Sequence, residues 1–298
     1  MKKIVSLTLV LVMCLSLCGF ANNGRVKAVE EKISAIGEVS LDSKNAIDSA
    51  QQAFDALTED EKAKVTNYFK LVKSQTALKE LEELEEQRLI EEQEKAKFDM
   101  GKETYENIKT AWQIADHIGT GIYNVWHGWV WEKEEMSSGG LQFFTDEASL
   151  SLEEIVEGFA ARNYVNERFA KTGVNWNDIS EADKEFYRDA TVEAFEKASK
   201  SRQYAGMSDV IWGTVYSFML NGDINEAQTL LESAKQGLKE LPTDYEYYSA
   251  LKEFYMTTSA LVDYCGSPSG SFDQYKVLLN DYRKEARDYM NGFDFAFE

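Results

Sequence analysis

Apolar residues recur at helical spacing between residues 105 and 129, where they define two adjacent faces of one predicted helix. The first face, in steps of three and four residues, comprises Tyr105, Ile108, Trp112, Ala115, Gly119, Ile122, Trp126 and Trp129. The second face comprises Ala111, Ile114, Ile118, Gly121 and Val125. Apolar surface therefore covers most of the circumference, and the segment Thr110–Trp131 is predicted to be a central helix buried among other helices.

A third stripe of this helix is almost entirely polar and uncharged. It comprises Thr110, Gln113, His117, Thr120, Asn124, His127 and Trp131. The stripe either lines a polar cleft that holds a ligand, or it is a flank that meets water or forms hydrogen bonds with neighbouring helices. If it lines a cleft, the candidate ligand-binding residues are His117, Asn124, His127 and Trp131.

The polar residues of this segment also exclude a helix that spans a membrane. Gln113, Asp116, His117, Asn124 and His127 would each be costly in hydrocarbon without partners. Three glycines point instead to close packing: Gly119, Gly121 and Gly128 each cost about 1 kcal/mol relative to alanine in a helix interior. We expect another helix backbone to approach at these positions.

The remainder of the chain also favours helices, because it has two prolines, few alternating β-branched runs, and much Ala, Leu, Glu and Lys. The pattern predicts an all-α protein in three folded parts. A small helical bundle over residues 22–83 is joined by a long charged helix over 84–101 to a larger helical domain over 102–298, packed around the central helix. Gly101 marks a candidate hinge, and Thr58 and Glu61 form a predicted capping box.

Two stretches of the first part carry a family resemblance. Residues 33–43 read ISAIGEVSLDS, and residues 53–67 read AFDALTEDEKAKVTN before a leucine-rich helix. The sequence of these residues resembles that of a small helical module common in exported and surface-anchored proteins of Firmicutes. The resemblance implies a spacer or accessory unit in a Gram-positive cell-surface context, and it implies no active site.

In the C-terminal domain, the residues between Met136 and Leu150 are predicted to form a loop, and the next helix to begin at Ser151 and stop near Gly173. Residues 211–242 resemble one helix-turn-helix unit of a tetratricopeptide repeat, with Gly222 at the turn. Since no second copy is present, we interpret this as a similar packing solution and not as a peptide-binding array.

The first 21 residues have the pattern of a secretory signal peptide: two lysines, an apolar run, and Gly19-Phe20-Ala21 at the cleavage position. Leu15 to Cys18 also approaches a lipobox, which would make Cys18 a lipidated N-terminus, although Leu17 departs from that pattern. We expect a secreted or cell-surface protein whose only membrane link would be this lipid anchor. The formal net charge of −20 makes nucleic acid a poor partner.

The sequence does not carry a recognisable catalytic constellation. His117 and His127 are ten residues apart, roughly 15 Å along a helix, and cannot share one metal ion. Cys265 lies at the end of an apolar stripe and is predicted to be a small buried hydrophobe. We therefore expect no metal and no cofactor.

Besides a purely structural surface protein with no soluble ligand, two functions follow from these observations. The first is a non-enzymatic binding or scaffold protein, with an unidentified protein or glycan as its partner. The second is a hydrolase or a glycan-type ligand-binding domain whose polar cleft runs along residues 110–131. The oligomeric state stays open.

Overall fold

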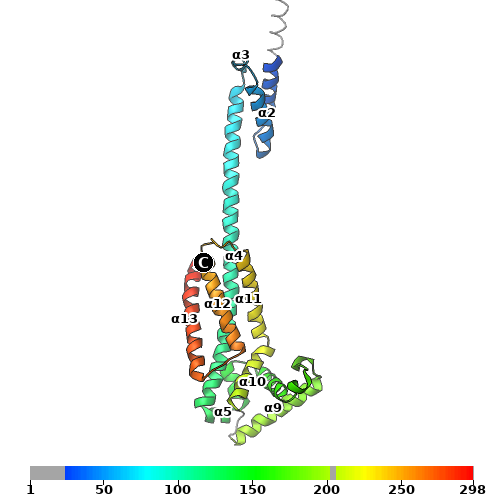
Figure 1. The fold of residues 1–298 in the computed structure, drawn as a ribbon, viewed down its shortest axis with the longest axis vertical. Helices are drawn as coiled ribbons and strands as arrows, with labels where there is room; N and C mark the ends of the chain where they lie inside the picture. Colours follow the sequence, from blue (N-terminus) through cyan, green and yellow to red (C-terminus); the bar gives the residue numbers. More distant parts are fainter. Residues whose placement is uncertain (1–23, 202–205, 298) are drawn as a thin grey trace, which may run out of the picture. The chain divides into compact units, whose positions relative to one another are not determined.

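The computed structural model describes residues 24–201 and 206–297. Within these ranges every element of regular secondary structure is helical (Figure 1), which confirms the predicted all-α class. The predicted signal peptide, residues 1–21, and the candidate lipidation residue Cys18 lie outside the described residues. Inside them, no helix has the length and apolar character needed to cross a membrane.

The chain divides into two compact units, Met1–Lys95 and Ala96–Glu298. The division falls inside one helix, α4 (Tyr68–Trp131), which is 64 residues long. The predicted connector and the predicted central helix are therefore parts of a single continuous helix. Gly101 is a regular, buried residue of α4, and the Tyr245 side chain occupies the space beside it.

The first unit packs four short helical elements against the start of α4. A helix over residues 24–35 is followed by η1 (Leu41–Ser43), α2 (Lys44–Asp55) and α3 (Glu59–Lys62). The buried apolar core contains Val26, Val29, Ile33, Ile36, Ile47, Ala50, Leu57, Val65, Leu71 and Leu78. These are the apolar positions of short amphipathic helices, whose stability depends on this shared burial.

The predicted capping box at the start of α3 is present. The carboxylate of Glu61 accepts hydrogen bonds from the backbone amide of Thr58, at 2.9 Å, and from its hydroxyl, at 3.1 Å. Arg25 lies 3.4 Å from the same carboxylate. The backbone hydrogen bond from Thr58 is the main cause that holds the pKa of Glu61 below its usual value, although the side chain is fully buried.

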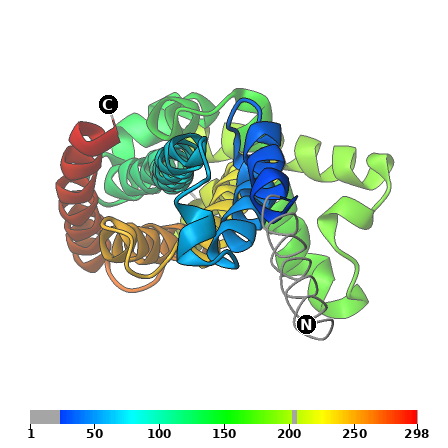
Figure 2. The same ribbon diagram turned by 90° about the horizontal axis from the view of Figure 1, so that it is seen from above.

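The second unit contains the C-terminal part of α4 and, among its described residues, nine further α-helices, one π-helix and one 3-10 turn. Figures 1 and 2 show their arrangement. In order they are α5 (Lys133–Gly139), α6 (Leu141–Ala148), α7 (Leu152–Tyr164), the π-helix η2 (Val165–Phe169), α8 (Ala170–Thr172), the 3-10 turn η3 (Trp176–Asp178), α9 (Glu181–Ser201), α10 (Met207–Leu220), α11 (Asp223–Glu240), α12 (Tyr248–Gly266) and α13 (Phe272–Phe297). The predicted loop over 136–150 is wrong, since α5 and α6 occupy it. Burial of Met136, Phe143 and Phe144 outweighs the low helix propensity of the intervening glycines.

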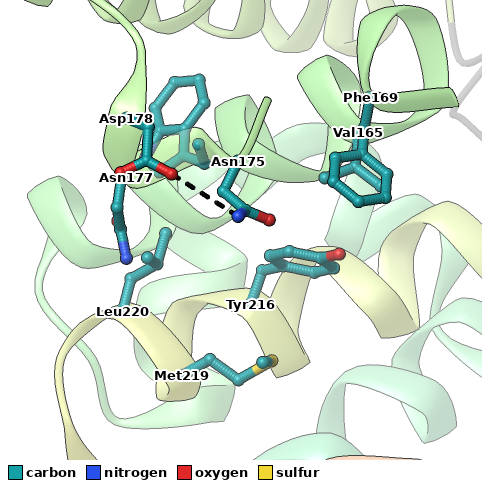
Figure 3. Close-up of a pocket in the computed structure, with 9 residues that line it drawn as sticks. Val165, Phe169, Asn175, Asn177, Asp178, Tyr216, Met219 and Leu220 are labelled. Atoms are coloured by element: carbon teal, nitrogen blue, oxygen red, sulfur yellow. Dashed lines mark hydrogen bonds between the residues drawn. The ribbon is translucent and has the colours of Figure 1, made fainter. Parts of the chain in front are cut away.

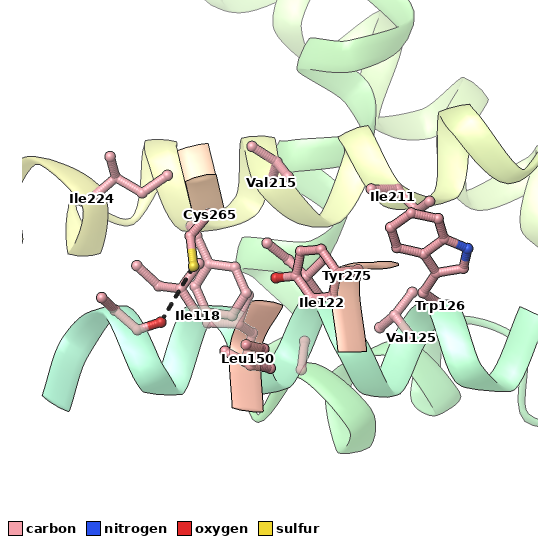
Figure 4. Close-up of a cluster of buried hydrophobic side chains, with 14 of the residues drawn as sticks. Ile118, Ile122, Val125, Trp126, Leu150, Ile211, Val215, Ile224, Cys265 and Tyr275 are labelled. Carbon is pink, nitrogen blue, oxygen red and sulfur yellow. Dashed lines mark hydrogen bonds between the residues drawn. The ribbon is translucent and has the colours of Figure 1, made fainter. Parts of the chain in front are cut away.

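The C-terminal part of α4 is the centre of this unit. Helices α11, α12 and α13 run beside it (Figure 1), and α10 faces it across the main buried cluster (Figure 4). Ile118, Ile122, Val125 and Trp126 of α4 belong to this cluster, as do residues from α5, α6, α7 and α10 to α13. The two apolar faces predicted from the sequence are thus largely buried, whereas the third stripe is not, as described below.

Close packing explains the glycines of α4, but only one of them meets another backbone. A Cβ atom at Gly121 would lie 3.1 Å from the Cα atom of Ala148. At Gly119 and Gly128 the space is filled by side chains: the added Cβ atom would lie 2.8 Å from Leu279 Cδ1 and 2.1 Å from Phe143 Cζ, respectively. The prediction of an approaching helix backbone is therefore right at Gly121 and wrong at the other two positions.

The predicted helix pair over residues 211–242 is present as α10 and α11. Gly222 between them has φ +101°, a conformation that favours glycine. Cys265 of α12 is fully buried, as predicted, and burial raises the pKa of its thiol to about 12. The last described residues are also helical, and Phe293 and Phe297 of α13 are buried in a second cluster with Tyr105 and Ile108 of α4.

Candidate functional site

The polar stripe of α4 faces solvent along much of its length. Gln113 and His117 are exposed, Asn124 and His127 are half-buried, and Trp131 is 59% exposed. The stripe is not sealed into the core. Most of the stripe is therefore a flank of α4 that meets water.

The candidate residues of the stripe have neighbours on different helices. The ring of His117 packs edge-on against Phe218 of α10, with 5.5 Å between ring centroids. Asn124 donates a hydrogen bond from Nδ2 to the backbone oxygen of Glu147, at 3.2 Å. His117 therefore contacts α10, whereas Asn124 contacts the end of α6, and the two do not form one site.

His127 and Trp131 lie together at the C-terminal end of α4. Their rings stack with centroids 5.2 Å apart, and Phe272 at the start of α13 packs against Trp131 at 4.9 Å. The Nδ1 atom of His127 lies 3.4 Å from Glu132 Oε1. Nearby, burial and then the negative charge of Glu132 raise the pKa of the Glu147 carboxyl. Three of the four predicted site residues are thus near this end of α4.

A cavity of about 390 Å³ lies elsewhere in the same unit (Figure 3). It is formed by the π-helix η2, the loop that contains η3, and the C-terminal half of α10. The lining residues are Val165, Phe169, Asn175, Trp176, Asn177, Asp178, Tyr216, Met219 and Leu220. We refer to it as the η3 pocket. Its volume is within the range of small-molecule sites.

Buried aromatic side chains hold the loop of the η3 pocket in place. Trp176 is buried, and its Nε1 atom donates a hydrogen bond to Glu157 of α7 at 2.8 Å. The ring of Tyr164 lies 5.8 Å from that of Trp176, and its hydroxyl donates to the backbone oxygen of Val174 at 2.8 Å. Arg188 of α9 pairs with the same Glu157. The pocket wall is therefore fixed by packing and hydrogen bonds to two helices.

The polar groups of the η3 pocket are suited to binding an uncharged ligand. Asn175 Nδ2 lies 3.5 Å from Asp178 Oδ2, and the ring of Tyr216 faces the Asn175 amide (Figure 3). Among the described residues that line the pocket, Asp178 is the one charged side chain. Amides and hydroxyls both donate and accept hydrogen bonds, so the pocket can satisfy mixed polar groups.

The structure also contains two more open cavities in this unit. One of about 350 Å³ is lined by Tyr164, Arg168, Thr172, Val174, Ile179, Asp183, Phe186 and Tyr187. Another of about 580 Å³ lies at the turn between α12 and α13, and its lining is mainly apolar. No residue of the α4 stripe lines any of these three cavities.

Sequence reasoning missed the η3 pocket. The local signal is present, since residues 175–178 read NWND between Gly173 and Ser180, an aromatic side chain among three short polar ones. The π-helix that supplies Val165 and Phe169 has no such signal. Within the described residues, no group of three or more His, Cys, Asp and Glu side chains is placed to hold a metal ion.

Comparisons of the chain with protein-family models, with curated proteins and with solved structures give no match. The candidate site therefore rests on the geometry described above.

Proposed function

We propose that the protein is an exported, non-enzymatic binding protein of the bacterial cell surface. Its C-terminal unit takes up a small ligand in the η3 pocket, and its N-terminal unit serves as a spacer or accessory module. The observation that carries this proposal is the pocket itself. A cavity of about 390 Å³ combines aromatic and aliphatic walls with a few polar side chains, the usual composition of a ligand site.

The lining favours binding over chemistry. Asn175, Asn177 and Tyr216 contribute amide and hydroxyl groups, which orient a ligand by hydrogen bonds. General acid-base catalysis needs a group whose pKa lies near the working pH. The polar side chains of this pocket supply hydrogen bonds, and this supports a binding role.

Two features of the sequence support the location and the role of the first unit. The apolar N-terminal run followed by small residues is typical of a signal peptide. The sequence of residues 33–67 resembles that of modules in exported and surface-anchored proteins. The partner of the binding unit is then a molecule outside the cytoplasm, either a glycan or a protein.

The test is a parallel measurement of binding and turnover. The purified protein is incubated with panels of glycans and short peptides, and both the melting temperature and the products are recorded. A ligand at one hundred times its Kd stabilises the folded state by about 2.7 kcal/mol, so binding raises the melting temperature. We expect Tyr216→Ala to remove this rise and Phe186→Ala, outside the pocket, to keep it. Turnover that one point substitution abolishes would contradict the proposal.

A second candidate function is a hydrolase at the end of α4. Burial raises the pKa of Glu147, close to His127 and Glu132, and this favours such a function, because a raised pKa brings a carboxyl closer to the range that general acid catalysis needs. This function requires hydrolysis of a glycan or peptide that Glu147→Gln abolishes and Tyr216→Ala leaves unchanged.

A further inference from the structure

We infer that the η3 pocket binds a neutral sugar unit, which packs one face on Tyr216 and places hydroxyl groups on Asn175 and Asp178. This inference rests on the proposed function and specifies the ligand class. It follows from the charge of the pocket, its hydrogen-bonding groups and its apolar walls.

Charge disfavours an anionic ligand. Among the described lining residues no lysine, arginine or histidine is present, and the carboxylate of Asp178 would repel a phosphate or carboxylate group. The whole chain has a formal net charge of −20, which adds a repulsive field at long range. Anionic polymers of the cell surface are therefore poor ligands for this pocket.

The hydrogen-bonding groups favour hydroxyl groups over a cation. The Nδ2 atom of Asn175 and the Oδ2 atom of Asp178 are 3.5 Å apart, a long contact that leaves both with capacity for another partner. A hydroxyl group donates and accepts at once, so it can accept from Asn175 and donate to Asp178. An ammonium group can only donate, so it can bind Asp178 but leaves the Nδ2 donor of Asn175 without an acceptor. Two neighbouring hydroxyls of a sugar fit this donor-acceptor pair.

The apolar walls match the C–H faces of a sugar ring. Tyr216 is half-buried with its ring toward the pocket (Figure 3), a rigid flat surface with little rotamer freedom to lose. Phe169 and Met219 line the rim and are 39% and 47% exposed, so they are available to a ligand. A molecule that is apolar on its faces and polar at its edge packs on these walls and can also form hydrogen bonds with Asn175 and Asp178.

The experiment is a titration of the full protein followed by calorimetry. The neutral probes are N-acetylglucosamine oligomers, cellobiose, maltose and mannobiose. The anionic probe is a galacturonate dimer, and the non-sugar probes are dipeptides and nucleosides. We expect at least one neutral sugar to bind. Tyr216→Ala weakens this binding about tenfold or more, whereas Tyr216→Phe, which keeps the ring, changes it about threefold or less.

A second variant guards against misfolding. Asn175 is exposed, so Asn175→Ala leaves the fold intact and should weaken sugar binding about fivefold or more. Phe186→Ala, an exposed aromatic side chain outside the pocket, is the matched control and should have no effect.

The outcomes separate the inference from the proposed function. Preferred binding of the galacturonate dimer, or binding of a dipeptide or nucleoside that Tyr216→Ala abolishes, overturns the sugar inference and leaves a binding protein. Hydrolysis of a neutral sugar that binds here overturns the non-enzymatic role and keeps the sugar inference. Failure of every probe to bind at millimolar concentration overturns both.

Discussion

Two glycines of the C-terminal unit differ in what surrounds them. A Cβ atom at Gly158 of α7 would lie 2.3 Å from the backbone nitrogen of Ser217 in α10, whereas one at Gly292 of α13 would meet nothing within 4 Å. Gly158→Ala should therefore lower the free energy of unfolding by about 1–3 kcal/mol, because the two backbones must move apart. Gly292→Ala should raise it by about 0.5–1 kcal/mol, because alanine is the better helix former.

Urea unfolding of both variants measures these changes. They are the same chemical substitution in the same unit, so opposite signs isolate the effect of packing. If both substitutions change the free energy of unfolding in the same direction, this would contradict the close approach of α7 and α10.

Glu147 predicts a pH dependence of stability. Because its pKa is raised in the folded state, its protonated form is favoured there. The stability that the folded state gains from protonated Glu147 is fully present below the pKa of this residue in the unfolded chain, about 4.3. It is lost as the pH rises through the pKa in the folded state. Glu147→Gln, which stays neutral, should therefore melt at a higher temperature than the wild type at pH 7. The difference should shrink toward zero below about pH 4.

Melting curves between pH 3.5 and 7 test this expectation. Glu193→Gln, an exposed carboxylate of α9, is the control. A wild type and Glu147→Gln variant that melt alike at pH 7 would show that burial and Glu132 do not disfavour the charged form.

At the scale of elements, the middle of α4 differs from its ends. Residues 82–96 are all exposed except Glu85, which is half-buried. Ion pairs of Arg88 with Glu85 and Glu92, on adjacent turns, are exposed and contribute little individually. This stretch is a solvated part of the helix that contributes no buried side chain to a hydrophobic core.

A proline at Ile90 should therefore break the helix locally without unfolding either core. We expect Ile90→Pro to reduce helicity in circular dichroism and to change the unfolding free energy of the C-terminal unit by less than about 0.5 kcal/mol. The same substitution at buried Ile118 should cost about 3 kcal/mol or more. Loss of the C-terminal fold on Ile90→Pro would refute the division of the chain within α4.

The sequence predicts those features of the helices that depend on residues close together in the chain. The capping boxes at Thr58 and Ser151 and the stop at Gly173, which has φ +67°, were all readable from spacing. The two apolar faces of α4 were readable for the same reason. The helices α5 and α6 were not, because tertiary burial of Phe144 overrides the weak propensity of its surroundings.

The candidate site was less predictable than the fold. Its lining comes from two segments about forty residues apart that meet only through packing, and the loop itself depends on the contact of Trp176 with Glu157. Sequence spacing placed the unusual polar residues on the α4 stripe instead. The structure brings Asn124, His127 and Trp131 near the end of that helix and separates His117 from them, against Phe218.

At the scale of the whole molecule, one long helix belongs to both a small helical module and a larger unit that contains the η3 pocket. The chain is strongly acidic, and the η3 pocket of its larger unit is lined by amides and aromatic rings. These features support the proposed binding role. We propose that a ligand enters the η3 pocket.

Methyl NMR of ¹³C-methionine-labelled protein tests that claim most directly. Met219 lines the pocket and is 47% exposed, whereas Met256 on α12 is 59% exposed and lies outside it. Substitution to leucine assigns each signal. On titration with a neutral sugar that binds, the account predicts a shift of the Met219 methyl signal and a constant Met256 signal. A saturable binding event that leaves Met219 unchanged would contradict it.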